Sequence, residues 1–454
     1  MGSNPTPCAI CSGRCAGAGT TESGWCDDDG PVTDYIPTED SLEPVELIRQ
    51  SSIVLRTGQL MLSAGTGSYR VKSAMQRVAQ AVGLDRHHAH VTLTEITATS
   101  HRGPIFRTEV TEVRSIGVNS DRLAELERMT RGLAPATTVD EVAAALDRIE
   151  SKPPLYRPML NAAWGGLACA AFAFLNNGGP IEIACVLFAA GAGQYVRRAF
   201  AHRRYNQFGT AGVAAAVSCL VYLGFVSGLE ALGVVGPQHE IGYISAVLFL
   251  IPGFPLMTAV LDLVKLDFSA GIARLTYALM ILTSAAISVW AVSSVAGLSP
   301  LPAVPLVIEP LVLVGLQLLA SFGGVLGFAL LFNSPGRMAL TAAAIGMIAN
   351  VVRIQLVHLG AAPQSGAAAG GVLVGLLAAW LAHRLGFPRI TVSVPAVVIM
   401  VPGSAAYRAV FFLNNGDTTQ AIAYGVQAGL VVTAIAIGLA VARMLTDSVW
   451  AFER

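Results

Sequence analysis

Residues 251–253, Ile-Pro-Gly, decide the fold of this chain, because the pattern returns 150 residues later as Val-Pro-Gly at 401–403. Each tripeptide lies about halfway along an apolar run. Proline removes a backbone donor and glycine admits unusual backbone angles, so we expect both helices to break there. In lipid a broken helix is tolerated only where protein or a water-filled cavity satisfies the freed backbone groups. Two related breaks therefore indicate a site near the middle of the membrane, the alternative being kinks that only adjust packing. The site candidates are Pro252, Gly253, Pro402 and Gly403.

The runs around these breaks belong to a longer series. Ten apolar segments follow Arg157, each near the ~20 residues that a helix needs to cross the hydrocarbon core. The sequence therefore predicts a polytopic α-helical membrane protein with ten transmembrane helices. The expected spans are 159–175, 181–197, 208–229, 242–264, 270–297, 309–332, 337–357, 367–385, 390–413 and 419–445.

Further matches extend the repeat. Asp267-Phe268-Ser269 returns as Asp417-Thr418-Thr419, again 150 residues later, and Val196-Arg197 returns 156 residues later as Val352-Arg353. The matches keep the same order, which indicates that spans one to five and six to ten are duplicates. Five is an odd number, so the second copy would enter the membrane from the opposite side. This predicts two inverted five-helix repeats.

Composition separates a polar first third from the membrane part. The 454 residues are 54% hydrophobic and 13% charged, yet residues 1–158 hold 36 of the charged side chains and residues 159–454 only 22. The net charge is zero and no basic block stands out in the polar part, which excludes a nucleic-acid-binding protein. We expect a disordered tail over 1–40, an α+β domain over 41–155, and the two repeats over 156–300 and 301–454.

The polar domain shows both helical and strand patterns. Apolar residues recur with a helical period over 42–63 and 69–82, and charged helices are expected over 120–131 and 139–150. Alternation over 90–99 and 105–114 predicts a hairpin between these pairs of helices. The histidines near its start are expected to be solvated at a helix-to-strand junction: His87, His88, His90 and His101.

The arginines predict the orientation. The connection after the second span holds Arg197, Arg198, Arg203 and Arg204, and short cytoplasmic loops carry the excess of Lys and Arg. No apolar signal-peptide region opens the sequence, so we expect the polar domain to stay in the cytoplasm. Both termini should then be cytoplasmic.

Charged side chains inside a bilayer are expensive and are therefore candidates for function. Arg353 with Asn350 on the seventh span, and Arg408 beyond the second break, are candidates to hold a carboxylate. Either arginine could instead reach to the membrane interface. Glu182, Asp262 and Glu309 are candidates for binding an ammonium group or relaying a proton, although their places near span ends also suit a plain interfacial role. Asp267 and Asp417 are expected on opposite sides as helix caps or gate elements.

The sequence gives only a weak signal for a metal site and contains none of the enzyme motifs named below. Four cysteines near the N-terminus could hold zinc, although their spacing is not that of a standard zinc site: Cys8, Cys11, Cys15 and Cys26. No nucleophile elbow, phosphate loop or HExxH pattern is present, so we expect neither hydrolysis nor ATP-driven transport, and no other cofactor.

With these residues described, the chain resembles the threonine/serine exporter family over about residues 42–445. The resemblance rests on the heptapeptide GTGSYRV at 65–71, on RSIGVN at 114–119, and on the Pro-Gly break in each five-span half. It implies a cytoplasmic domain fused to ten spans in the bacterial inner membrane, and export of threonine and serine driven by the proton motive force. A related two-subunit form is associated with dicarboxylate export.

Together these features predict a secondary exporter of small polar amino acids, with protons and the lipid bilayer as further partners. A dicarboxylate exporter of the same architecture is the first alternative, because Arg353 and Arg408 would match two carboxylates. A membrane-anchored sensor or enzyme is the second alternative. A homo-oligomer stays open.

Overall fold

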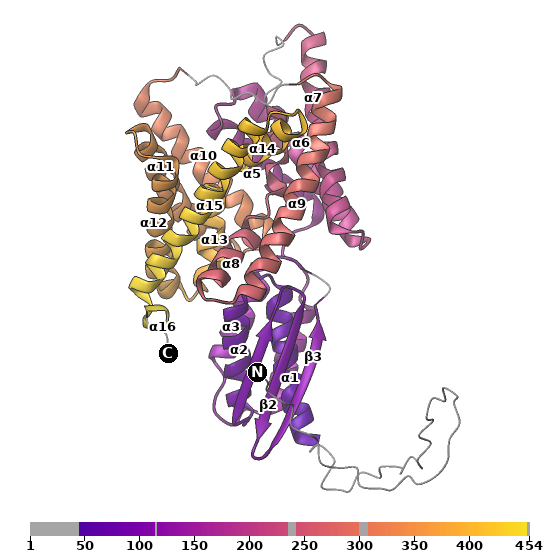
Figure 1. Cartoon of the computed structure of the whole chain (residues 1–454), viewed down its shortest axis with the longest axis vertical. Coiled ribbons are helices and arrows are strands. Elements are labelled where there is room, and N and C mark those ends of the chain that lie inside the picture. The colour runs from indigo at the N-terminus through magenta and orange to yellow at the C-terminus, as the bar shows by residue number, and fades with distance from the viewer. Residues whose placement is uncertain (1–44, 114–115, 235–241, 299–306, 452–454) are drawn as a thin grey trace, which may run out of the picture. The chain divides into compact units, whose positions relative to one another are not determined.

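The computed structural model describes residues 45–113, 116–234, 242–298 and 307–451 (Figure 1). The four N-terminal cysteines, and with them the predicted zinc site, lie outside the described residues. The described chain begins with a domain of helices and strands and continues as a long series of apolar helices.

The N-terminal domain pairs helices with a three-stranded antiparallel sheet in the order β1-β2-β3. Helix α1 packs on β2 and β3, and α2 packs on β1, so the two helices cover one side of the sheet. Its elements are α1 (Val45–Ser63), α2 (Ser68–Ala81), β1 (Arg86–Val91), β2 (Glu95–Arg102), β3 (Ile105–Glu112), α3 (Ser120–Arg131) and α4 (Val139–Ser151). All four predicted helices of this domain are confirmed.

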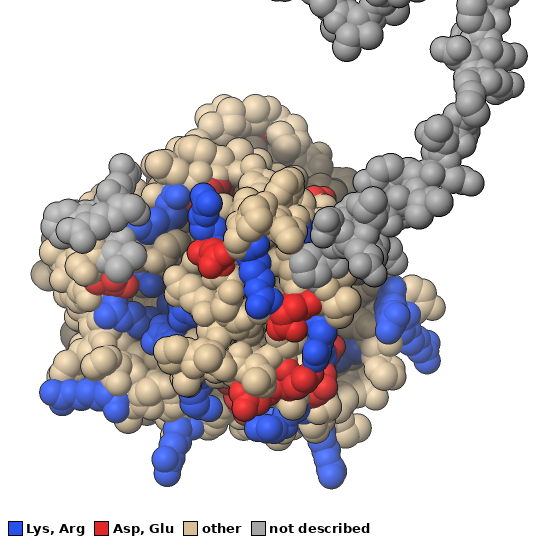
Figure 2. All heavy atoms as spheres, turned by 90° about the horizontal axis from the view of Figure 1, so that it is seen from below, with Lys and Arg blue, Asp and Glu red and all other residues tan. Residues whose placement is uncertain are grey.

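The core of this domain follows from the helical period of its apolar residues. Leu47, Val54 and Met61 of α1 are fully buried, as are Met75 of α2 and Ile96 of β2. The end of the molecule that this domain forms carries interspersed positive and negative side chains (Figure 2). Such mixed charge is typical of a water-exposed surface.

The predicted hairpin is wrong in one respect, because the sheet has a third strand. The stretch predicted as one strand over 90–99 turns between Thr92 and Glu95, where the Thr92 amide donates to the Glu95 carbonyl at 2.9 Å and the Glu95 amide donates to the Thr92 hydroxyl at 3.1 Å. The residues before this turn pair with β2 from Arg86 onward. His87, His88 and His90 therefore lie on a strand, and His87 is buried rather than solvated.

Apolar helices form the rest of the described chain. They are α5 (Pro158–Leu175), α6 (Pro180–His202), α7 (Gln207–Ala231), the 3₁₀ helix η3 (Ser245–Leu250), α8 (Gly253–Val264), α9 (Phe268–Val295), α10 (Pro310–Leu331), α11 (Gly336–His358), α12 (Pro363–Leu385), α13 (Arg389–Val398), α14 (Gly403–Asn414), α15 (Thr418–Thr446) and the short α16 (Ser448–Ala451). Among the described residues, seven of these helices are long and apolar enough to cross a membrane, and the bent pair α13–α14 makes an eighth. The chain is a polytopic helical membrane protein.

Both helices that contain Pro-Gly are broken, as predicted. Pro252 separates η3 from α8, and Pro402 separates α13 from α14, where the axis bends by 53°. The two prolines have nearly the same backbone angles, φ −78° and ψ 58° at Pro252 and φ −81° and ψ 63° at Pro402. In each break the glycine amide donates to the carbonyl two residues earlier at 2.8 Å, which is an inverse γ-turn.

Candidate functional site

The two breaks lie against one another. A Cβ atom on Gly253 would stand 2.7 Å from Cγ2 of Val398, which ends α13, and a Cβ atom on Gly403 would stand 2.0 Å from Cδ1 of Ile251. Gly253 of the first break therefore lies against the segment before Gly403, and Gly403 of the second break lies against the segment before Gly253. The two breaks therefore meet in one place, and glycine is required at both positions because a Cβ atom would overlap these neighbouring side chains.

Broken helices leave backbone groups that a continuous helix would pair internally. At each break one helix or 3₁₀ segment ends in carbonyl groups and the next begins with amide groups. Amide groups at a helix start attract carboxylates, and carbonyl groups at a helix end attract cations. The place where the two breaks meet, called the crossing of the breaks below, therefore brings both kinds of backbone group together.

Hydroxyl groups lie close to the second break. Tyr407 of α14 is buried, its hydroxyl is 3.3 Å from that of Ser293 on α9, and its ring meets the Tyr243 ring edge-on at 6.0 Å. Arg408 follows Tyr407 and places its guanidinium 5.8 Å from the centre of the Tyr424 ring. Of these residues only Arg408 was predicted, because sequence reasoning considered charged side chains and not buried hydroxyls.

A polar set joins α10 and α11. Asn350 is fully buried, and its amide donates to the Ser321 hydroxyl at 2.9 Å. Arg353 donates from Nε to Oδ1 of Asn350 at 3.0 Å, so the two predicted residues do lie together. A second amide pair, Gln317 with Gln355, joins the same two helices at 2.9 Å.

A similar polar pair joins α5 and α6. The Gln194 amide donates to Oδ1 of Asn161 at 2.8 Å, and both residues are buried. Sequence reasoning missed this pair, although the 156-residue offset relates Gln194 to Asn350 just as it relates Arg197 to Arg353. Applying the same offset to neutral polar residues would have found it.

Asp262 and Asp267 connect the membrane helices to the N-terminal domain. Asp262 is an ion-pair partner of Arg274 on α9 and also accepts from the Ser68 amide at the start of α2, at 3.0 Å. Asp267 accepts from the Ser68 hydroxyl at 2.6 Å and forms an ion pair with Lys72. The junction therefore involves the GTGSYRV motif, and Asp267 contacts the N-terminal domain instead of capping α9.

The remaining acidic candidates lie at helix starts. Asp417 caps α15 by accepting from the Gln420 amide at 3.0 Å, and Glu309 caps α10 by accepting from the Val312 amide at 2.9 Å. Glu182 is buried in the first turn of α6.

Asp267 and Asp417 lie at opposite ends of α9. Asp267 precedes its first residue, whereas Asn415, two residues before Asp417, accepts from the Trp290 indole near its last turns at 3.0 Å. A helix rises about 1.5 Å per residue, so the length of α9 separates the two aspartates by most of a membrane's thickness. They do not share one binding site.

Metal ligands do not gather in the part of the chain that the structure describes: no group of three or more His, Cys, Asp or Glu side chains there could hold a metal ion. Burial lowers the pKa of His87 to about 4, and the neighbouring His88 adds to this shift. The ring of His87 instead makes a 3.0 Å hydrogen bond with the Ser100 hydroxyl.

Comparison with known proteins gives consistent results across the chain. A family model described as "Putative threonine/serine exporter" matches residues 52–296, and a second, "Threonine/Serine exporter, ThrE", matches residues 317–445. A "Probable threonine/serine exporter" of Mycobacterium tuberculosis is 26% identical over 84% of this chain and 73% of its own length. No solved structure matches.

Two further relatives match smaller parts of the chain. A "Probable succinate transporter subunit YjjP" of Escherichia coli is 27% identical over 52% of this chain and 93% of its own length. A "Threonine/serine exporter" of Corynebacterium glutamicum is 27% identical over 34% of each chain. Because the first family model alone covers more than half of the sequence, the chain belongs to the threonine/serine exporter family.

Proposed function

We propose that this protein is a secondary active exporter of threonine and serine, with its substrate bound where the two Pro-Gly breaks cross. The observation that carries the proposal is the packing of Gly253 against Val398 and of Gly403 against Ile251. This packing brings carbonyl and amide ends of helices to one place inside an apolar bundle. Such a place suits a small zwitterion, whose two charges are opposite.

An inverted repeat supports transport by alternating access. Helix α8 begins at the first break and ends at the N-terminal domain, where Asp262 accepts from the Ser68 amide. Helix α14 begins at the second break and ends near the other end of α9, where Asn415 accepts from the indole of Trp290. The equivalent helices α8 and α14, each of 12 residues, therefore point to opposite ends of the molecule (Figure 1).

The helix bounds agree with the same duplication. Helices α6 and α11 each have 23 residues, and their first residues, Pro180 and Gly336, are 156 positions apart. Counting α6 and the broken unit η3–α8 as crossings gives the ten spans that the sequence predicts. We propose that rocking of one repeat against the other opens the crossing alternately to each side.

Arg353 and Asn350 are the side chains that we propose for binding the substrate carboxylate on its way through the second repeat. A guanidinium with an adjacent amide offers several donors to two carboxylate oxygens. Arg197 and Gln194 hold the related places in the first repeat. The duplicated pair would give the substrate one polar contact set on each side of the crossing.

The proton motive force is the proposed source of energy. Asp262, Glu182 and Glu309 remain the proton-coupling candidates, and Asp262 is the strongest because its carboxylate is buried beside Arg274 where a helix contacts the N-terminal domain. We place the N-terminal domain and both termini in the cytoplasm of a bacterium, with the helices in its inner membrane. The cluster of arginines at the end of α6 supports this orientation.

Export of a dicarboxylate is the second candidate, because a relative named as a succinate transporter subunit matches 52% of the chain. Purified protein in proteoliposomes, given labelled threonine, serine and succinate with and without a proton gradient, separates the two. Gradient-dependent movement of threonine or serine alone supports the first proposal, and movement of succinate alone supports the second. No movement of any of the three contradicts both and favours a sensor or enzyme.

A further inference from the structure

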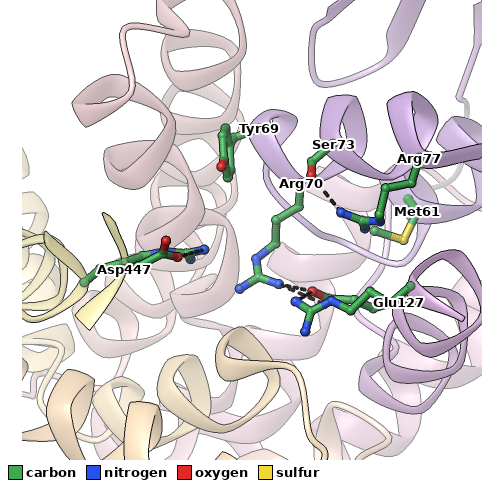
Figure 3. A pocket seen from close by; sticks show the side chains of 9 residues that line it. Met61, Tyr69, Arg70, Ser73, Arg77, Glu127 and Asp447 are labelled. Atoms are coloured by element: carbon green, nitrogen blue, oxygen red, sulfur yellow. Dashed lines mark hydrogen bonds and ion pairs between the residues drawn. The ribbon is translucent and has the colours of Figure 1, made fainter. Parts of the chain in front are cut away.

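A polar pocket lies away from the crossing of the breaks, between the N-terminal domain and the last long helix (Figure 3). Its volume is about 140 Å³, and α1, α2, α3 and α15 all contribute to its walls. The lining residues are Met61, Tyr69, Arg70, Ser73, Arg77, Glu127, Arg131, Arg443 and Asp447.

Positive charge dominates this pocket, which four arginines and two acidic residues line. Glu127 accepts two hydrogen bonds from Arg70, at 2.9 and 2.8 Å, and forms an ion pair with Arg131. Burial raises the pKa of Glu127, but the arginines around it outweigh burial and lower the pKa overall. Glu127 is therefore ionised and neutralises one arginine, and Asp447 lies 3.6 Å from Arg443.

Arg77 has a different set of partners. Its guanidinium donates to the Ser73 hydroxyl at 2.8 Å and to the Thr130 hydroxyl at 3.2 Å, both neutral groups. Its buried Nε has no hydrogen-bond partner among the residues that the structure describes, and the same holds for Nε of Arg443. A buried donor without a partner is unfavourable, so both guanidinium groups have capacity for a ligand oxygen.

We propose that this pocket binds a phosphoryl dianion between Arg77 of the N-terminal domain and Arg443 of α15. Four arginines against two carboxylates leave two positive charges, which a phosphate group with its charge of about −2 would balance. Several oxygens on one phosphorus can accept from more than one guanidinium at once. A zwitterionic amino acid has no net charge and matches the pocket less well, so the site is distinct from the transport site.

The place of the pocket indicates what binding would do. Arg443 also lies 4.6 Å from the Trp450 ring, and Lys265, which follows α8, lies 4.5 Å from the same ring. A phosphoryl group held by Arg77 and Arg443 would fasten α2 to α15 next to the end of the broken helix. Binding would therefore stabilise one arrangement of the N-terminal domain on the membrane helices.

Thermal unfolding of the full-length protein tests the site without relying on transport. In detergent we expect inorganic phosphate to raise the Tm in a saturable way, measured against potassium chloride of equal ionic strength. In nanodiscs the comparison is phosphatidylcholine with and without phosphatidic acid. A response to soluble phosphate alone identifies a soluble ligand, and a response to phosphatidic acid alone identifies a lipid headgroup; both support the site.

Variants make the assignment specific. Arg77→Gln and Arg443→Gln should each raise the phosphate concentration needed for half of the Tm shift roughly tenfold, because each removes a charge-assisted hydrogen bond. Arg148→Gln, on the exposed face of α4, is the control and should respond as the wild type does. The proposal is overturned when neither phosphate nor phosphatidic acid changes the Tm, when chloride has the same effect, or when both pocket variants keep the full response.

Discussion

Asp262 and Arg274 form an ion pair that is almost completely removed from water, with 3.1 Å between Oδ2 and Nε and only 3% of each side chain exposed. The pair joins α8 to α9, and each member also contacts the start of α2: Asp262 accepts from the Ser68 amide, and Arg274 donates to the Thr66 carbonyl at 2.8 Å. The broken segment η3–α8 is therefore joined to the N-terminal domain by an ion pair and by hydrogen bonds to the backbone.

Asp262→Asn should lower the stability of the protein by about 3–5 kcal/mol, because it leaves the Arg274 charge buried without its partner. Thermal unfolding in detergent micelles measures the change. The double variant Asp262→Asn with Arg274→Gln should recover part of the loss, since no unpaired charge remains. Asp147→Asn, which breaks an exposed ion pair with Arg56, should change stability by less than about 1 kcal/mol. Equal effects of the two single variants would contradict this interpretation of the pair.

The crossing of the breaks predicts a rescue experiment. Gly403→Ala should reduce threonine flux and cost about 1–3 kcal/mol of stability, because its Cβ would overlap Cδ1 of Ile251. Ile251→Val removes that atom, so the double variant should regain most of the flux. Gly429→Ala on α15 meets open space and serves as the control. If Ile251→Val gives no rescue, the close approach at the break is not what limits Gly403.

Much of the fold was predictable because its signals are local. The length of the apolar runs and the Pro-Gly pairs predicted where the membrane helices lie and where two of them break. The sheet was harder, because the turn at Thr92 depends on one hydroxyl and contains neither glycine nor proline. Because of this turn, the stretch predicted as one strand belongs to two strands, and β1 was not predicted.

The candidate site was predictable only in part. The breaks follow from the Pro-Gly pairs, and Asn350 lies beside Arg353 because the two residues are three positions apart on one helix. The contact of Asp262 with Ser68 joins residues that are 194 positions apart, and no periodicity signals it. The neutral Gln194 was overlooked because the predicted polar candidates centre on charged side chains, and Asn350 is among them only as the companion of Arg353.

His87 predicts how the stability of the N-terminal domain changes with pH. Its pKa of about 4 is below the ordinary 6.5, so the unfolded chain binds a proton first as pH falls. Above pH 6.5, His87 should have no effect on the free energy of unfolding. This free energy should fall as the pH drops from 6.5 to 4, and the contribution of His87 should be constant below pH 4. Unfolding of the full-length protein across this range should show a shallower loss for His87→Gln than for wild type. His90→Gln, which alters an exposed residue on the same strand, should keep the wild-type slope, and a matching slope in both variants would contradict the assignment.

Variants of Arg353 distinguish a role of this side chain in substrate binding from a role at the membrane interface. If its guanidinium, held by Asn350, contacts the substrate carboxylate, Arg353→Gln should lower kcat/KM for threonine about 10- to 100-fold, the size expected when a hydrogen bond to a charged group is lost. Arg353→Lys keeps the charge but loses the planar fork, so it should recover only part of the activity. Initial rates in proteoliposomes, normalised to the amount of inserted protein, give the comparison, with Arg148→Gln as the control. An arginine that only anchors α11 at the interface would leave kcat/KM of the glutamine variant near the wild-type value, because the side chain would then make no contact with the substrate at any step.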